Sequence, residues 1–311
     1  MEFIPFTFCE SVALRLSNDR LRELKPIRAK MWDKAAAEMI GHRMQVRIML
    51  CCFNGEWSYN LAMKEGAQIE YRVVSFLELK KSSQRMHVRR MHIGLYSEKK
   101  TSATFEEIME IVHFTFPLLY RASLWIMGRP DSPNYSDDEL TRILSIYQDS
   151  FIAMIIQYRK TNEFLKNQLN SANSLDRLTL SSIKWSEGVR LALEEFAIAK
   201  PFRSINSISS KLVFEQAFFE RLFEKTLTGR KFRKTEFKAR FSFKFKELRA
   251  FKPEFQDVEA AAQLPTEGIW LMQLTSKLQH IVWRRSDGVR ITATYVVEDK
   301  RWIITFKRRE K

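Results

Sequence analysis

The stretch 118–158, LLYRASLWIMGRPDSPNYSDDELTRILSIYQDSFIAMIIQY, holds the pattern that decides the fold of this chain. Its two ends, 118–127 and 151–158, are short apolar runs, which predicts two buried β-strands. Between them, Ser136 precedes three acidic residues and then a run with helical spacing, which predicts a helix with an acidic first turn. The order strand, helix, strand indicates an α/β protein.

The same alternation extends on both sides of this stretch. Further strand-like runs lie at 87–96, 175–183 and 202–208, and further helix-like runs lie at 104–114, 161–169, 186–199 and 211–227. The strand starts are about 24 to 33 residues apart, in the range of leucine-rich-repeat units. One such unit cannot cover its own apolar face, so we expect residues 43–228 to stack as a strand–helix solenoid. A doubly wound sheet has the same alternation, but no strand is followed by a glycine-rich phosphate turn.

After Gly229 the pattern changes to strands without long helices between them. Strand-like runs occupy 237–251, 268–285, 288–298 and 301–309, while 253–268 is polar and predicts a loop with a short helical piece. We therefore expect residues 229–311 to form an antiparallel β meander, which caps the solenoid or forms a small appended domain.

Basic residues concentrate in this last part of a chain whose net charge is +15. In FKARFSFKFK (237–246), phenylalanine alternates with other residues, which predicts a strand with its rings in the core. The outer face would then be a basic surface formed by Lys238, Arg240, Lys244 and Lys246. Three readings stay open: charges that keep an outer face hydrated, a partner protein with an acidic face, or nucleic acid. Rings that point inward cannot stack on bases, which argues against nucleic acid.

The first 42 residues form a separate group of short helices. Phe8, Val12 and Leu16 recur at spacing four, and a later run carries Trp32. Pro26 interrupts the helical pattern between Leu16 and Trp32. Leu21 and Leu24 lie one turn apart, and the pattern as a whole predicts three short helices with one shared apolar face. Three helices of this size are too small to fold alone, so we expect them to dock on something.

This layout resembles a degenerate F-box, and the opening PFTFCESV (5–12) with the Trp32 helix is similar to the large nematode families of F-box-like proteins. The positions that match an F-box are Pro5, Val12, Leu16, Leu21, Leu24, Ile27 and Trp32. The resemblance implies that these seven residues bind the small adaptor of cullin-RING ubiquitin ligases. It also implies that the leucine-rich-repeat-like region, 43–228, binds a protein target. The chain would then be a substrate-recognition subunit that positions a target lysine and performs no chemistry itself.

Residues for catalysis are sparse. The chain has no phosphate-binding, dinucleotide-binding, zinc-protease or serine-hydrolase motif, so we expect no enzyme and no cofactor. The spacing of Cys51, Cys52, His87 and His92 matches no zinc pattern, so we expect no metal. We expect the two histidines, five apart on a strand, to point to opposite faces. Neither a signal peptide nor a membrane-spanning run is evident, which favours the cytoplasm or nucleus.

Two other functions stay open beside the substrate-recognition subunit. One is an interaction scaffold whose F-box has become a structural cap. The other is a basic protein associated with nucleic acid, whose binding would weaken steeply as salt rises.

Overall fold

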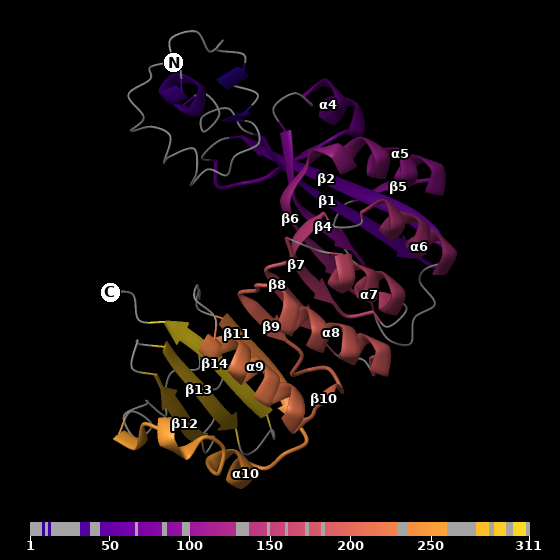
Figure 1. Cartoon of the computed structure of the whole chain (residues 1–311). Coiled ribbons are helices and arrows are strands. Elements are labelled where there is room, and N and C mark those ends of the chain that lie inside the picture. Colours follow the sequence, from indigo (N-terminus) through magenta and orange to yellow (C-terminus); the bar gives the residue numbers. More distant parts are fainter. Residues whose placement is uncertain are drawn as a thin grey trace. The chain divides into compact units, whose positions relative to one another are not determined.

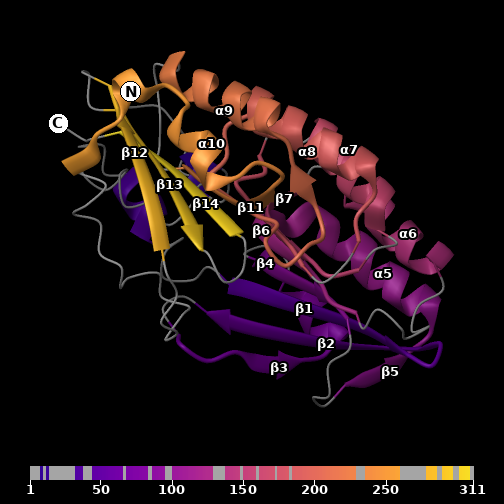
Figure 2. The ribbon, with the colours of Figure 1, turned by 90° about the horizontal axis from the view of Figure 1, so that it is seen from below.

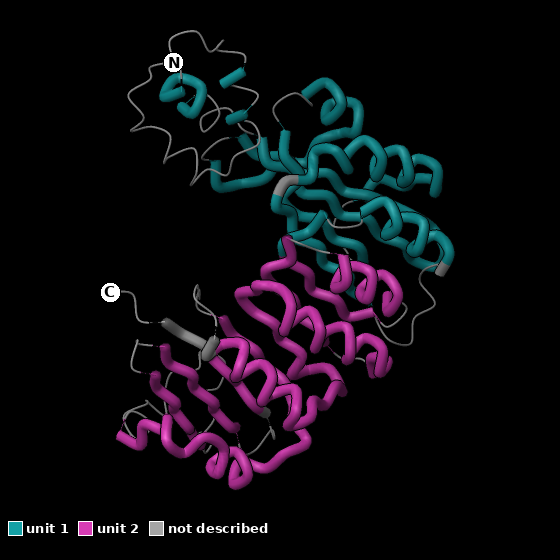
Figure 3. Tube along the Cα trace, viewed as in Figure 1, with its two compact units in different colours: residues 1–152 teal, residues 153–311 magenta. Residues whose placement is uncertain are grey.

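The computed structural model describes residues 8–9, 12–13, 32–37, 44–65, 68–82, 86–94, 100–128, 137–147, 150–158, 161–171, 174–181, 184–228, 235–259, 278–285, 289–296 and 301–308. In these residues fourteen strands and a set of helices form a mixed α/β arrangement, which confirms the predicted class (Figure 1). The chain has two compact units, 1–152 and 153–311 (Figure 3). The predicted division into 1–42, 43–228 and 229–311 stays a prediction.

The sheet of unit 1 combines an antiparallel hairpin with parallel strands. Its strands lie in the order β6 (Leu119–Ile126), β4 (Met86–Ile93), β1 (Met44–Phe53), β2 (Glu56–Glu65) and β3 (Arg72–Val74), and β5 (Thr101–Ala103) also pairs with β2. β1 runs antiparallel to β2 but parallel to β4, which is parallel to β6. Asn54 and Gly55 join β1 to β2 with φ values of 52° and 83°, the left-handed conformations that a tight hairpin turn requires.

Unit 1 contains the helices α4 (Phe76–Lys81), α5 (Phe105–Thr115) and α6 (Asp137–Ile146), with a 3₁₀ turn, η2 (Phe116–Leu118), after α5. Side chains of the preceding residues cap the first N–H groups of α4 and α5. The Glu107 backbone N–H donates to the Thr104 hydroxyl at 3.2 Å, and the Thr104 N–H donates to the Glu107 carboxylate at 2.8 Å. This reciprocal cap explains why the predicted helix of 104–114 starts here.

The apolar core of unit 1 lies between α5 and one face of the sheet. Val46, Ile48 and Leu50 alternate along β1 and are completely buried. Figure 2 shows α5 and α6 lying along one face of the sheet. Buried residues that complete this layer are Val88, Met91, Ile93, Ile108, Ile111, Val112, Leu124 and Ile126. The side chains at the odd positions of β1 point to the opposite face.

Unit 2 begins with parallel strands and ends with antiparallel ones. The order is β7 (Phe151–Ile156), β8 (Arg177–Leu180), β9 (Ser204–Asn206), β11 (Thr235–Phe241), β14 (Arg301–Arg308), β13 (Val289–Val296) and β12 (Leu278–Arg284), and β10 (Val213–Phe214) also pairs with β11. Strands β7, β8, β9 and β11 are parallel neighbours in chain order. Strands β12, β13 and β14 pair antiparallel in chain order, as predicted, but β11 pairs with β14 and not with β12, so the four strands do not form one simple meander.

The long helices of unit 2 lie on one face of this sheet. Figures 1 and 2 show α7 (Asn162–Ser171), α8 (Glu187–Ala199) and α9 (Gln216–Thr228) side by side. Right-handed connections between parallel strands that advance in one direction place every helix on the same face. A doubly wound sheet reverses its strand order and therefore has helices on both faces.

Two elements near the C-terminus differ from the sequence prediction. The strand predicted over 237–251 ends at Phe241, and a short helix, α10 (Phe245–Arg249), follows. The Lys244 backbone N–H donates to the Glu247 carboxylate at 2.7 Å, which stabilises a helix start rather than a longer strand. The helix predicted from Lys211 begins at Gln216, since β10 precedes it. Within 253–268, where a short helical piece is predicted, the described residues contain a 3₁₀ turn, η4 (Pro253–Phe255), and helical residues at 258–259.

Aromatic rings fill the core between α9, α10 and the antiparallel strands. Trp283 lies 5.4 Å from Phe223 and 6.1 Å from Phe219, measured between ring centroids. Its indole N–H donates to the Phe251 carbonyl oxygen at 3.0 Å, so its polar atom is satisfied. Trp302 stacks on Phe245 at 5.8 Å. These packed rings connect the helical layer of unit 2 to the C-terminal strands.

Two lysines join the C-terminal ends of neighbouring helices in unit 2. The Lys200 ammonium, just after α8, donates to the Asn170 carbonyl of α7 at 2.8 Å. The Lys225 ammonium of α9 donates to the carbonyls of Ala197 and Lys200 at 2.7 and 3.0 Å. The last carbonyls of a helix lack partners within it and carry its negative dipole end. Each helix therefore caps the one before it, and burial lowers the pKa of Lys225.

Replacing Lys225 by alanine is expected to lower the free energy of unfolding by about 1–3 kcal/mol, because two carbonyl groups lose a donor in a half-buried place. Urea unfolding followed by tryptophan fluorescence measures the change. Lys211→Ala, at an exposed lysine, is the matched control and should change stability by less than about 0.5 kcal/mol. Equal losses in the two variants would contradict the capping role.

Candidate functional site

The described residues include two of the seven predicted adaptor-binding positions. Val12 and Trp32 are half-buried and helical. Phe8, whose side chain is 52% exposed, packs edge to face against Trp32 with ring centroids 6.3 Å apart. The other five positions, Pro5, Leu16, Leu21, Leu24 and Ile27, lie outside the described residues. Adaptor binding by this group stays a prediction.

The four predicted basic residues do not share one strand. Lys238 and Arg240 lie on β11, where the Lys238 ammonium pairs with the Glu236 carboxylate at 3.1 Å. Lys244 precedes α10 and Lys246 lies within it, because the strand ends at Phe241. Arg240, Lys244 and Lys246 are exposed. The predicted single basic strand face is therefore wrong beyond Arg240, and one of its cations is already paired.

A different cluster of cations lies in unit 1, on the sheet face opposite Val46, Ile48 and Leu50. Strand register decides its membership, because paired residues of neighbouring strands point to the same face. Arg47 of β1 pairs with Arg90 of β4. His92 of β4 pairs in turn with Trp125 of β6. We name this surface the cation–aromatic face, and its members are Arg47, Lys64, Tyr71, Arg90, His92 and Trp125.

The prediction that His87 and His92 point to opposite faces is wrong. The pairing of β4 with β1 shifts after Val88, so Arg89 is an extra residue in the strand. His87 pairs with Gln45 and His92 with Met49, two residues that are four apart on β1 and therefore share a face. Both imidazoles are buried. A bulge that depends on the neighbouring strand is not visible in the sequence of β4 alone.

Each cation of this face rests against an aromatic ring. The guanidinium carbon of Arg47 lies 4.3 Å from the centroid of the Tyr71 ring, and the Lys64 ammonium lies 5.3 Å from it. The guanidinium of Arg90 lies 5.4 Å from the Trp125 ring. The His92 ring stacks on the same indole at 4.9 Å, with an angle of 22° between the planes. Such contacts hold a cation in place without neutralising it.

Carboxylates are missing from the centre of this face. Among the described residues, neither Arg47 nor Arg90 has an ion-pair partner, and the Nε atom of Arg47 is buried without a hydrogen bond. Burial and the positive charges of Arg90 and Arg47 lower the pKa of His92 to about 4. His92 is therefore neutral at pH 7. The residues that β1 and its neighbours place around these two arginines are Gln45, Met49, Cys51, Ser58, Asn60, Ala62, His87 and Ser123.

Sequence reasoning missed this face, although one signal was present. In MQVRIM (44–49) and MHVRRM (86–91), polar and basic residues interrupt short apolar runs. Charged residues at alternate positions of a strand indicate that one face of the sheet is not entirely apolar. The contact between the two strands could not be inferred without their register.

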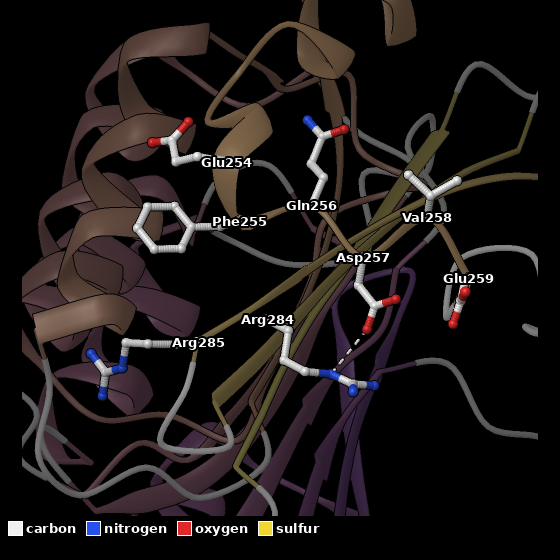
Figure 4. A pocket seen from close by; sticks show the side chains of 8 residues that line it. All are labelled: Glu254, Phe255, Gln256, Asp257, Val258, Glu259, Arg284 and Arg285. Atoms are coloured by element: carbon white, nitrogen blue, oxygen red, sulfur yellow. Dashed lines mark ion pairs between the residues drawn. The ribbon is translucent and has the colours of Figure 1, made fainter.

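Unit 2 has a shallow surface hollow of about 360 Å³ beside η4 and the end of β12 (Figure 4). The Asp257 carboxylate pairs with the Arg284 guanidinium at 3.0 Å across it. Figure 4 shows the side chains of Arg284 and Arg285 extending in opposite directions. Val258, 77% exposed, also lines the hollow. Asp257 and Arg284 neutralise each other, and Arg284 and Arg285 extend apart, so the hollow lacks the converging groups of a ligand site.

No cluster of three or more His, Cys, Asp or Glu that could hold a metal occurs among the described residues. Cys9, Cys51 and Cys52 are buried free thiols, and burial together with Glu139 raises the pKa of Cys52 to about 11. A thiol held protonated in this way is a poor nucleophile. Within the described part of the chain, no helix is long and apolar enough to cross a membrane.

Comparison with known protein families gives no match, and comparison with curated proteins gives none either. Among solved structures, the MycE methyltransferase from the mycinamycin biosynthetic pathway, in complex with Mg, SAH and mycinamycin VI, aligns with a TM-score of 0.20 and 10% identity over 98% of this chain and 93% of that chain. Another structure of MycE, with Mg and SAH, gives the same TM-score of 0.20 and 10% identity over 98% of this chain and 92% of that one. Likenesses this weak carry no argument about fold or function.

The buried His92 predicts a pH dependence of stability. Its pKa is about 4 in the folded state against a usual 6.5, so the unfolded chain binds the proton more tightly. The contribution to stability is therefore complete above pH 6.5 and is lost as the pH falls toward 4, by up to about 3 kcal/mol.

Urea unfolding at several pH values between 4.5 and 7.5 measures this dependence. In His92→Gln, the free energy of unfolding should change less with pH over that range than it does in the wild type. The matched control is His113→Gln, at an exposed histidine of α5, which should keep the wild-type slope. If the pH dependence of the unfolding free energy were the same in His92→Gln and the wild type, the lowered pKa of His92 would not be its cause.

Proposed function

We propose that this chain is the substrate-recognition subunit of a cullin-RING ubiquitin ligase, acting in the cytoplasm or nucleus. Its N-terminal helices would bind the adaptor and its strand–helix layer would bind a protein target. The observation that carries the target-binding part is the cation–aromatic face, where Arg47 and Arg90 lie on neighbouring strands and have no carboxylate partner among the residues that the structure describes. A surface that holds unneutralised, ring-supported cations is suited to binding a partner of opposite charge.

We interpret the strand–helix layer as leucine-rich-repeat-like. Two observations support this interpretation in unit 2: the parallel strands follow chain order, and a lysine caps the end of each preceding helix in α7 and α8. A repeated contact between successive helices is what a solenoid requires, since each unit is stabilised by its neighbours. The helices on one face leave the other face of the sheet available to a target.

The N-terminal helices support the adaptor-binding part. Phe8 is half exposed and contacts the ring of Trp32, so apolar surface is present at the beginning of the chain. Trp and other large rings dominate the energetics of protein interfaces when a partner covers them. The mechanism is proximity: the ligase holds the target near the ubiquitin-carrying enzyme, and this chain contributes no reacting group.

A pull-down of the tagged full-length chain with the purified adaptor tests this proposal. The double variant Leu16→Asp, Leu21→Asp should lose adaptor binding by at least about tenfold, because each charge would enter an apolar interface. The matched control is Leu77→Asp, at a residue of α4 that is 64% exposed, and it should bind like the wild type.

The outcomes separate two functions. Binding that the double variant loses and the control keeps supports the substrate-recognition subunit. A folded, monodisperse chain that does not bind the adaptor contradicts it and favours a scaffold whose N-terminal helices are only structural.

A further inference from the structure

We propose that the cation–aromatic face binds an extended acidic segment of a partner protein, with separate carboxylates of that segment paired to the guanidinium groups of Arg47 and Arg90. The inference rests on the proposed function, because it names the chemistry of the target that the chain would recognise. Unit 1 alone supplies the residues involved.

The strand register places the backbones of Arg47 and Arg90 side by side, while their guanidinium groups extend apart, toward Tyr71 beside β3 and toward Trp125 of β6. Arg47 and Arg90 are direct partners on parallel strands, and neighbouring strands lie about 4.8 Å apart. Two acidic residues of one extended segment could therefore each pair with one guanidinium group. Among the described residues, neither arginine has a carboxylate partner, so an acidic segment would supply the missing anions.

The aromatic rings keep these cations in position. Tyr71 supports Arg47, and Trp125 supports Arg90, which leaves the N–H groups at the edges of both guanidinium planes to donate. His92 stacks on Trp125 and stays neutral at pH 7, so it neither repels nor neutralises an acidic partner. A partner would therefore meet donors that are already oriented, which lowers the entropy lost on binding.

The same contacts favour a peptide over a nucleic acid. Stacking on bases requires a free ring face, but Arg47 and Lys64 both lie against Tyr71. The Trp125 ring contacts both Arg90 and His92. Side chains of this chain therefore already cover the rings, whereas the two guanidinium groups have no carboxylate partner among the described residues.

An exposed apolar residue lies on the same face and adds a contact that peptides can use. Val73 of β3 pairs with Ala62 of β2, and Ala62 pairs with Arg47. The Val73 side chain is 67% exposed. An extended segment that places acidic residues over the arginines could cover this valine with an apolar side chain, which accounts for both the charge and the exposed apolar surface.

Fluorescence anisotropy with the full-length chain tests the proposal. The probe is a labelled ten-residue peptide in which glutamate alternates with valine, and its partner is the same peptide with glutamine. We expect the glutamate peptide to bind at least about tenfold more tightly, and Arg47→Ala and Arg90→Ala each to weaken it by about tenfold or more. The matched control, Arg177→Ala, alters an exposed strand arginine of unit 2 and should bind like the wild type.

A second readout does not depend on the loss of binding. A bound carboxylate offsets the positive charges that lower the pKa of His92, so the glutamate peptide should raise that pKa in an NMR titration. The glutamine peptide should leave it unchanged. Near-UV circular dichroism of each variant shows whether the core is intact.

Several outcomes overturn the inference. They are equal affinity for the two peptides, full affinity in folded arginine variants, no binding of the glutamate peptide, and tight binding of a 20-residue oligothymidine that Arg47→Ala and Arg90→Ala weaken. None of these changes the adaptor pull-down, which depends on residues 1–42. Failure here with adaptor binding intact would leave the proposed function standing and remove only the acidic target.

Discussion

The structure depends on one constraint: a single strand or helix cannot bury its own apolar face without neighbouring elements. Ile48, Leu124 and Leu178 are each almost completely buried, because neighbouring strands and helices of the same unit cover them. Hydrogen bonds between paired strands, and helices on one face of the sheet in each unit, satisfy this requirement together. The strands from β7 to β11 therefore advance in chain order, with their long helices on one face.

That arrangement explains where the candidate site lies. Helices cover one face of the sheet in unit 1, so polar and charged residues can occupy alternate positions of the same strands on the other. Arg47 lies between two completely buried residues, Val46 and Ile48, yet its own side chain reaches Tyr71. The fold thus produces a surface of rigid backbone that presents oriented cations, a better support for recognition than a mobile loop.

The sequence was sufficient to predict most of the helices and strands, but not the residues at which they end. Thr104 and Ser186 mark helix starts that the structure confirms, because capping is a local interaction between residues three apart. The prediction over 237–251 failed where Lys244 and Glu247 form a cap instead of continuing the strand. The hairpin at Asn54 and Gly55 was overlooked, although Asn-Gly between apolar runs is a strong local signal.

By itself, the sequence determined the α/β class, the alternation of strands and helices, and the antiparallel C-terminal strands, because periodicity and capping depend on near neighbours along the chain. Only the tertiary structure decided that Arg47, Arg90 and Trp125 share one face. Their meeting requires the register of three strands and a bulge at Arg89. Register is fixed by hydrogen bonds between residues far apart in sequence, and shifting it by one residue would move every side chain to the other face.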